Sequence, residues 1–232
     1  MPYSTRVLSK HEDIASFEGL AALLRADHPH CKLTIESREV TGESDEFADD
    51  EDEFQGEDDE LSGAELWQSL LLSSDDDVEI AVLECHPVYP GSIGDDQIAD
   101  FLEEIRDARP ESGAAWLRDF LSEVKTIYSF EHLQGAEFED GSNALHALRS
   151  AIFQRGESIL QADLEGFTNE DGHHIVWQFA DTVSGAWNMA VLQDGTWHPF
   201  KMDLGDPDQR EAFLSGVVPS DVSSVQLPSS KD

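Results

Sequence analysis

The sequence predicts an α+β protein with antiparallel sheets and amphipathic helices packed on one face. Three observations predict this class. Residues 65–73 and 78–85 are two apolar strands separated by a turn of Ser and Asp. Residues 95–109 repeat apolar side chains at i, i+3, i+4 and i+7, which is the spacing of a helix face. Asp194 and Gly195 form a two-residue turn between two further alternating strands.

The first half of the chain is expected to alternate strands and helices. Ile14, Phe17 and Leu20 share one face of a helix that opens at the acidic residues after His11, and Pro29 prevents its continuation. The elements expected in order are a strand at 5–9, this helix, a strand at 31–40, the hairpin of 65–73 and 78–85, a helix at 95–109 that Pro110 ends, and a second helix reaching residue 124.

The second half repeats this mixture. Ser142 is a plausible N-cap for a helix that ends near Gly156, and Asp206 caps a final helix with Pro207 in its first turn. Between these helices we expect a four-stranded meander. The elements are a strand at 125–133, the helix from 142 to 155, strands at 158–167, 173–180, 186–193 and 196–204, the helix from 206 to 216, and a frayed tail.

The register of the last hairpin follows from its turn. A two-residue loop fixes which residues face each other, and here one face comes out almost wholly apolar. A slip of one residue would destroy that match. His198 is accordingly expected on the buried face. The predicted pairs are Val191 with His198, Met189 with Phe200, and Trp187 with Met202.

The two halves of the chain resemble each other. The segment GDDQIADFL at 94–102 is similar to GDPDQREAFL at 205–214, and each follows a hairpin whose first strand carries Trp67 or Trp187. Two duplicated β-α-β-(β)-β-β-α units would explain this, and chance similarity of capped amphipathic helices would explain it equally. The domain boundaries that follow are 1–124 with an acidic loop at 41–62, 125–216, and a flexible tail at 217–232, unless all form one compact domain.

Charge is the outlying property of the composition. Fifty acidic residues face 14 basic ones, for a formal net charge of -36 and a pI near 4.2. Residues 43–60 hold 12 of the acids and no base, so the rest of the chain is acidic in its own right. Such a field repels nucleic acid and anionic membranes and attracts basic proteins or peptides. Adaptation of a soluble protein to a salty cytoplasm is the alternative explanation.

The location expected from the sequence is the cytoplasm. The chain has two cysteines, which do not make a disulfide framework, and its first residues lack the apolar core of a signal peptide. Its apolar runs are too short to span a bilayer. No nucleotide, phosphate-loop or nucleophile-elbow motif occurs, and we expect no cofactor.

Two histidine and cysteine clusters suggest a metal site. Zinc takes Cys and His in tetrahedral sets, so two clusters at strand ends could supply four ligands if the fold brings them together. Their spacing matches no standard zinc module. The alternative is a helix end capped by histidines, with two buried thiols. The candidate metal ligands are His28, His30, Cys31, Cys85 and His86.

A polar face on the meander is the second candidate site. Asp163 and Glu165 alternate with apolar neighbours, and His174 has the matching position on the next expected strand. Such a face could perform acid–base chemistry, or it could be the solvated side of an antiparallel sheet. Trp197 points the same way and marks either a binding surface or a docked helix.

We therefore expect a non-enzymatic binding protein. The acidic loop would attract a basic protein or peptide, with carboxylates steering and an aromatic residue anchoring the partner. An enzyme or metal protein using the polar face or the metal set is one alternative, and a salt-adapted domain whose acidity gives only solubility is another. The loop residues expected to bind the partner are Glu51, Asp52, Glu53 and Phe54.

Overall fold

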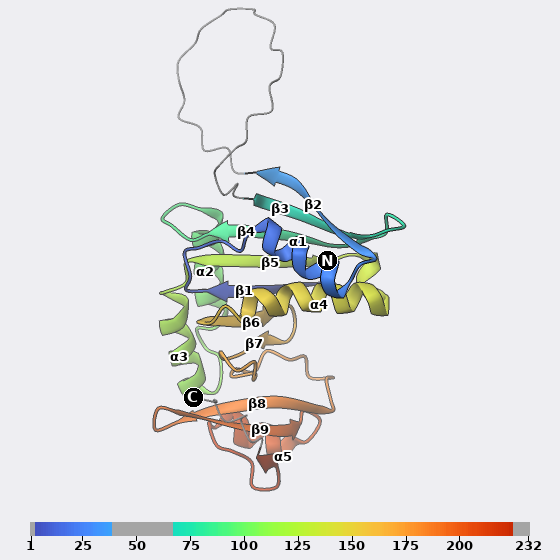
Figure 1. Ribbon diagram of the computed structural model, residues 1–232. Coiled ribbons are helices and arrows are strands. Elements are labelled where there is room, and N and C mark those ends of the chain that lie inside the picture. Colours follow the sequence, from blue (N-terminus) through green and yellow to red (C-terminus); the bar gives the residue numbers. More distant parts are fainter. Residues whose placement is uncertain (1–2, 39–66, 225–232) are drawn as a thin grey trace, which may run out of the picture.

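Two antiparallel sheets organise the protein. The computed structural model describes residues 3–38 and 67–224, and Figure 1 shows their strands as a large sheet beside a smaller one. The large sheet has seven strands in the order β2-β3-β4-β5-β1-β6-β7, and the small sheet has three in the order β10-β9-β8. The predicted α+β class with antiparallel sheets is confirmed. The strands are β1 (Ser4–Ser9), β2 (Cys31–Arg38), β3 (Trp67–Ser74), β4 (Glu79–Pro87), β5 (Thr126–His132), β6 (Ser158–Ala162), β7 (Gly166–Phe167), β8 (Ala186–Gln193), β9 (Thr196–Asp203) and β10 (Ser223–Ser224).

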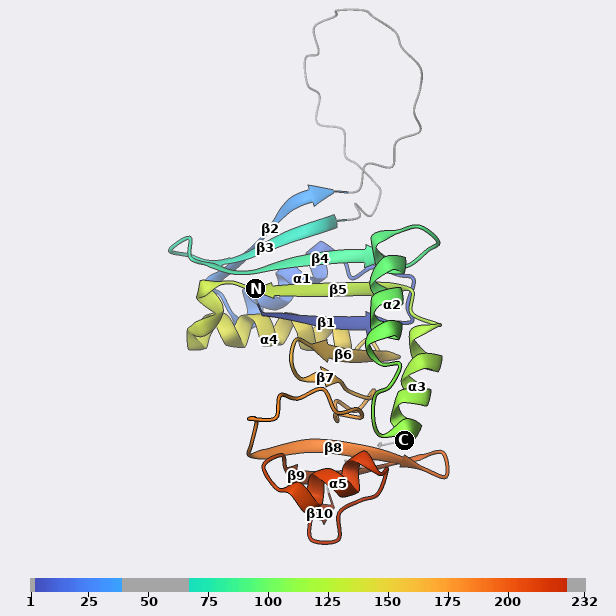
Figure 2. The same cartoon turned by 180° about the vertical axis from the view of Figure 1, so that it is seen from behind.

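Helices cover both faces of the large sheet, where the sequence suggested one. Helices α1 and α4 lie on one face, and α2 and α3 lie on the other (Figures 1 and 2). The inner strand β1 shows why, because its adjacent residues Val7 and Leu8 point to opposite faces and are both fully buried. The helices are α1 (Phe17–Asp27), α2 (Ile93–Glu104), α3 (Glu111–Leu121), α4 (Glu139–Phe153) and α5 (Pro207–Leu214), with a 3₁₀ turn η1 (Gln134–Glu137) before α4.

Side-chain caps fix where several helices begin. The Ser16 side chain accepts from the Gly19 amide and starts α1, a few residues after the start expected near His11. The Ser92 side chain accepts from the Asp95 amide and starts α2. Asp206 caps α5 as expected, with Pro207 at the first helical position. The capping side chains, rather than the first acidic residues, mark these helix starts.

The expected four-stranded meander is wrong. Residues 158–167 divide into β6 and β7 around a turn in which Leu164 has a positive φ of 66°. Residues 173–180 form no strand, and only His174 makes isolated bridges, to Thr168 on one side and to Met189 on the other. The two strands before this segment, β6 and β7, join the large sheet, and the two after it, β8 and β9, form the small sheet together with β10. His174 is thus a one-residue seam between the sheets.

The hairpin of β8 and β9 has the predicted register. Its three predicted pairs all occur, and α5 covers one face of the small sheet with Phe213 packed against Phe200. His198, however, is exposed and not buried. It lies near the hairpin turn, and the continuous apolar cover on β9 starts two residues later, at Phe200. The alternation of apolar and polar residues predicted the correct face of the sheet. It could not show how far along β9 that face is buried by other residues.

The structure does not confirm the internal duplication. The hairpin that carries Trp67 lies inside the large sheet, whereas the hairpin that carries Trp187 forms the separate small sheet. Strand β5, which opens the expected second unit, pairs with both β1 and β4 of the first. The boundary expected after residue 124 therefore falls within one sheet. The tail is ordered as far as β10, which pairs with β9; the loop at 41–62 and the tail after 224 lie outside the described residues.

Candidate functional site

Asp163, the first residue of the predicted polar face, has a structural role. One of its carboxylate oxygens lies 2.8 Å from a guanidinium nitrogen of Arg6, and the other accepts from the Ser4 amide at 3.0 Å. These contacts tie the turn after β6 to the neighbouring strand β1. With both oxygens engaged, Asp163 is a poor candidate for binding a partner.

Glu165 and His174 line a small cavity, which we call the Arg149–Glu165 cavity. It has a volume of about 200 Å³ and lies where α4 meets β1, β6 and β7. Arg149 reaches it from α4, and Tyr3 and Thr5 reach it from the start of the chain. Thus two residues of the predicted polar face share a site with a cation that the sequence analysis did not select. Its lining residues are Tyr3, Thr5, Arg149, Leu160, Gln161, Ala162, Glu165, Gly166, Thr168, Gly172 and His174.

Hydrogen bonds hold the polar walls of this cavity in place. The Tyr3 hydroxyl donates to a Glu165 carboxylate oxygen at 3.0 Å. The guanidinium of Arg149 donates to the Thr5 hydroxyl at 3.2 Å, and that hydroxyl lies 3.3 Å from Nε2 of His132. Burial, followed by the charge of Glu165, raises the pKa of Tyr3, so its hydroxyl keeps its proton at neutral pH. The wall is therefore a set of fixed donors and acceptors.

His174 is buried, although the sequence analysis placed it on a solvated face. Its ring packs against Phe179 and Trp187 with centroid distances of 5.0 and 5.3 Å. Burial lowers its pKa to about 4, in opposition to a hydrogen bond with the main chain of Glu165 that raises it. The ring is neutral at pH 7, and among the described residues its Nδ1 has no hydrogen-bond partner. The alternation used to orient it failed because 173–180 is not a strand.

Trp197 packs against a helix, which is one of the two alternatives predicted for it from the sequence. Its ring packs edge-on against Trp116 of α3, with centroids 5.2 Å apart. Trp116 also stacks on Phe120 of the same helix. Trp197 therefore connects the small sheet to α3 and is not a free binding surface.

The proposed metal ligands do not meet. Cys31 pairs with Ser74 at one end of β3, whereas Cys85 follows Glu84, which pairs with Ser69 near the other end. At about 3.3 Å per residue the two cysteines are separated by roughly 17 Å or more. Both are buried in the same apolar core. Across residues 3–38 and 67–224, no group of three or more His, Cys, Asp or Glu side chains could hold a metal ion.

The three histidines of that set have separate surroundings. His28 ends α1, where its amide donates to the Leu24 carbonyl oxygen. His30 is exposed and has its Nδ1 3.5 Å from a carboxylate oxygen of Asp75. Nε2 of His86 lies 3.5 Å from a carboxylate oxygen of Glu84. The helix-end alternative thus fits His28, and the other two contact acids of their own regions.

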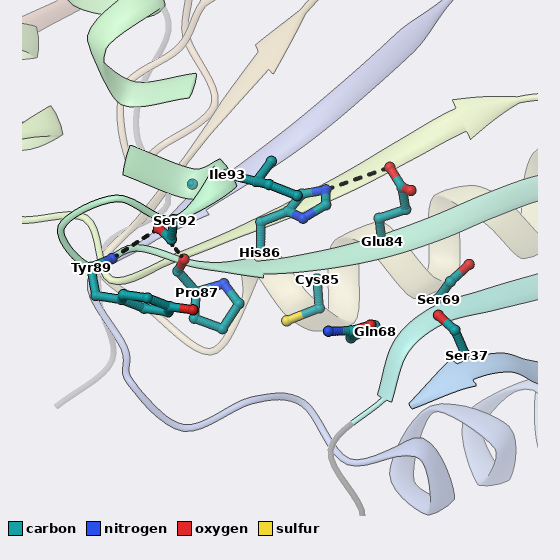
Figure 3. A pocket seen from close by; sticks show the side chains of 11 residues that line it. Ser37, Gln68, Ser69, Glu84, Cys85, His86, Pro87, Tyr89, Ser92 and Ile93 are labelled. Carbon is teal, nitrogen blue, oxygen red and sulfur yellow. Dashed lines mark hydrogen bonds and ion pairs between the residues drawn. The ribbon is translucent and has the colours of Figure 1, made fainter. Parts of the chain in front are cut away.

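A second hollow, the β4–α2 pocket, lies where β4 leads into α2 (Figure 3). It has a volume of about 250 Å³, and its floor is made by the ends of β2, β3 and β4. Figure 3 shows Cys85 and His86 on opposite sides of β4, with His86 directed toward Glu84. The lining residues are Ser37, Gln68, Ser69, Glu84, Cys85, His86, Pro87, Tyr89, Ser92, Ile93 and Gly94, and they include no lysine or arginine.

The rim of the β4–α2 pocket presents two large apolar side chains to solvent. Tyr89 is 56% exposed and Ile93 is 64% exposed. The loop between them is rigid, because the Ser92 hydroxyl accepts from the Tyr89 amide at 3.1 Å and donates to the Pro87 carbonyl at 3.0 Å. An aromatic residue in a Pro- and Gly-containing loop is the sequence signal that could have indicated this site, and that loop was not among the predicted sites.

Two lining residues of the β4–α2 pocket flank the most acidic part of the chain in sequence. Ser37 and Gln68, which line it, are close in sequence to the two ends of residues 39–66. Those residues contain 14 Asp and Glu and no Lys or Arg. The selected residues Glu51, Asp52, Glu53 and Phe54 belong to this segment and lie outside the described residues.

A third hollow at the opposite end of β3 serves as a comparison. It has a volume of about 580 Å³ and is lined by Asp75, Asp76 and Asp140 together with the exposed ring of Phe138. We call it the η1–α4 groove, since η1 and the start of α4 form one wall. Like the β4–α2 pocket it combines an exposed ring with carboxylate and no lysine or arginine, but it has three carboxylates against one and lies at the other end of β3.

Comparison of the chain with protein-family models, curated proteins and solved structures finds no match. Among the described helices, none has the length and apolar character needed to cross a membrane. The proposals below therefore rest on the geometry and the charge of this chain.

Proposed function

We propose that this protein is a non-catalytic binding protein for a basic segment of a partner, which docks at the β4–α2 pocket. One observation carries the proposal. Exposed Tyr89 and Ile93 line the same pocket as the carboxylate of Glu84, no lysine or arginine lines it, and its residues Ser37 and Gln68 flank the acidic segment in sequence. The pocket thus offers apolar and anionic contacts together, and two of its lining residues flank the acidic segment in sequence.

The protein's own cations do not neutralise this charge. Many of the basic side chains already contact carboxylates of the folded body, which leaves most acids without a cationic partner. A field of this sign raises the local concentration of basic ligands and speeds their association. Such attraction between exposed charges is screened over a Debye length of about 8 Å at physiological salt. The ion pairs are Arg6–Asp163, Lys10–Glu123, Lys32–Asp77, Arg106–Glu103 and Arg210–Asp181.

Short-range contacts would select the docked segment. An arginine or lysine over the Tyr89 ring would gain a cation–π interaction of about 0.5–1 kcal/mol at such an exposed site. Ile93 offers apolar contact to the aliphatic part of the same side chain, and Glu84 offers an ion pair. The hydrogen-bonded loop holds Tyr89 before binding, so little order is lost on docking.

The pocket offers little for catalysis. Of the serine hydroxyls that line the pocket, that of Ser92 caps α2 and donates to the Pro87 carbonyl, and that of Ser69 donates to a Glu36 carboxylate oxygen. A serine engaged as a helix cap is not poised for proton transfer to a base. Binding is therefore the function that this geometry supports best.

The test is fluorescence anisotropy with a labelled oligo-arginine peptide and an oligo-glutamate peptide as the sign control. We expect the arginine peptide alone to bind, and its affinity to fall at least tenfold from low to high salt, since screening removes the long-range attraction. Tyr89→Ala should weaken binding about two- to fivefold, equivalent to the loss of one exposed cation–π contact. Glu84→Gln should weaken it and reduce the salt dependence.

A matched variant separates docking from general attraction. Phe138→Ala removes an exposed ring from the η1–α4 groove and should leave binding unchanged. Equal weakening by Phe138→Ala and Tyr89→Ala would mean that the peptide does not dock specifically at the β4–α2 pocket. The same conclusion would follow if neither variant weakened binding while the salt dependence persisted. Deletion of 43–60 should slow association more than it speeds dissociation. An affinity that is independent of salt would contradict the electrostatic part.

A further inference from the structure

The Arg149–Glu165 cavity contains two opposite charges that do not pair with each other. Both side chains line the same space, from α4 and from the turn between β6 and β7. The ion pairs within 4.0 Å among the described residues include neither of them. This cavity instead keeps a cation and an anion apart across a space of about 200 Å³.

Arg149 has unused hydrogen-bonding capacity. A guanidinium carries five N–H donors, and among the described residues that of Arg149 makes one side-chain hydrogen bond, to Thr5. Burial lowers the pKa of Arg149, which shows that its charge is partly removed from water, yet an arginine stays charged at any physiological pH. Tyr3 and Glu165 offset this burial only in part, and a carboxylate bound directly to the guanidinium would offset it further.

Glu165 has unused capacity of the opposite kind. The Tyr3 hydroxyl occupies one carboxylate oxygen, and no hydrogen bond within the described residues reaches the other. Its place is fixed by the turn, where Leu164 adopts a positive φ and the Glu165 amide donates to the Ala162 carbonyl. The carboxylate is therefore positioned to accept from an ammonium group inside the cavity.

We infer that this cavity binds a small zwitterion of the α-amino acid class, with its carboxylate on Arg149 and its ammonium on Glu165. A single anion would satisfy only Arg149 and would have to enter against the acidic field of the whole chain. A single cation would satisfy only Glu165 and would be repelled by Arg149. A zwitterion matches both charges and carries no net charge into the field.

The size and the walls of the cavity restrict the ligand. At about 30 Å³ for each water-sized group, 200 Å³ holds roughly six or seven non-hydrogen atoms, which suits a small amino acid. The Thr168 hydroxyl is already engaged by the Leu160 amide and the Asn169 carbonyl, so this wall offers no free donor. The buried ring of His174 closes another side. A small apolar side chain, as in alanine, fits these walls better than a long or charged one.

The test measures binding of L-alanine, acetate and methylammonium to the full chain by calorimetry and by thermal unfolding. We expect L-alanine to bind and to raise the unfolding temperature, and the two single-charge compounds to bind at least tenfold more weakly. Arg149→Gln and Glu165→Gln should each reduce L-alanine affinity at least tenfold. Tyr3→Phe, which removes only the hydroxyl that holds Glu165, should reduce affinity without loss of fold.

Controls make each outcome decisive. His146→Gln changes an exposed residue of the same helix and should bind L-alanine as the parent does. Equal binding of acetate and L-alanine, or no binding of L-alanine to a folded parent, would overturn the inference, as would full affinity in Arg149→Gln. Oligo-arginine binding should be unaffected by Arg149→Gln, so this inference and the proposed function can fail separately.

Discussion

The hairpins β3–β4 and β8–β9 share local signals but differ in what surrounds them. Each has a tight turn and a tryptophan in its first strand. Trp67 of the first is fully buried and donates to the Ala15 carbonyl at 2.7 Å, whereas Trp187 of the second is half-buried against the His174 ring. Strand β4 pairs with β5 over seven residues, whereas among the described residues the bridges of His174, to Thr168 and to Met189, are what link the backbone of β8 to the large sheet. Turn residues and alternation specify both hairpins locally, whereas the strands that each hairpin pairs with determine which sheet it joins.

This difference implies unequal stability. The large sheet is covered by two apolar clusters, with helices on both faces, while the small sheet has its own smaller cluster around Phe213. Its connections to the rest include the His174 bridge, the fully buried Ala190 of β8 in the core beneath α2 and α3, and the contact of Trp197 with α3. Regions with fewer long-range contacts open at lower free energy than the core. We therefore expect the small sheet to open first.

The largest expected effect comes from removing one buried ring on each side of this comparison. Phe130→Ala in β5 and Phe213→Ala in α5 each empty a fully buried site and should each cost about 3–5 kcal/mol. Phe130→Ala should lower the free energy of global unfolding, because β5 is the centre of the large sheet. Phe213→Ala should mainly lower the protection of β8 and β9 amides, measured by native-state hydrogen exchange with urea unfolding alongside.

The parent protein provides the reference for this pair. Its β5 amides should exchange only with global unfolding, and its β8 amides at lower free energy. If Phe213→Ala lowers the protection of β5 and β8 amides by the same amount, the two sheets unfold as one unit, which would contradict their unequal stability.

The next effect concerns the seam. His174 has a pKa of about 4 in the fold against an ordinary 6.5, so the unfolded chain binds more protons between these values. The stability from the neutral ring is complete above pH 6.5 and is lost as the pH falls toward 4. The loss is about 3 kcal/mol, since each unit of pKa difference is 1.36 kcal/mol. Urea unfolding at pH 7 and near pH 4 should show it, because the seam cannot hold a charged ring against Phe179 and Trp187.

The variant His174→Gln separates the effect of His174 protonation on stability from the effect of the many carboxylates that also titrate. It starts less stable, but acidification should cost it about 3 kcal/mol less than it costs the parent. His146→Gln, on an exposed face of α4, should follow the parent. Parallel losses in the parent and in His174→Gln would mean that another group governs the acid response.

The same comparison explains how far the sequence could predict the fold. Turn chemistry and alternation predicted the hairpins and even the pairs of β8 with β9, because a two-residue turn fixes register locally. They misplaced residues 173–180, where the pattern was that of a strand but only His174 is bridged. Whether an apolar run pairs depends on which edge it reaches in space, and that is not a local property.

The candidate sites show the same limit. Glu165 and His174 were selected from their alternation and do line one cavity, yet Arg149 and Tyr3, which complete it, lie far away in the sequence. The predicted metal ligands do not come together, although they were expected to meet at the start of β2 and the end of β4. Strand β3 lies between these two strands. Residue type indicated the chemistry, and only strand order decided which residues came together.

The smallest expected effect tests the second connection of the small sheet. Trp116 and Trp197 stack edge-on across the α3 and β9 contact, and aromatic pairs of this geometry contribute about 0.5–1.5 kcal/mol beyond the area they bury. A double-mutant cycle with Trp116→Leu and Trp197→Leu, measured by urea unfolding, should give a coupling energy in this range. Trp116 also stacks on Phe120, so Trp197→Leu should be the milder single change. A coupling near zero would mean that the ring contact does not hold the small sheet to α3, and would leave the His174 bridge and the buried Ala190 as its connections.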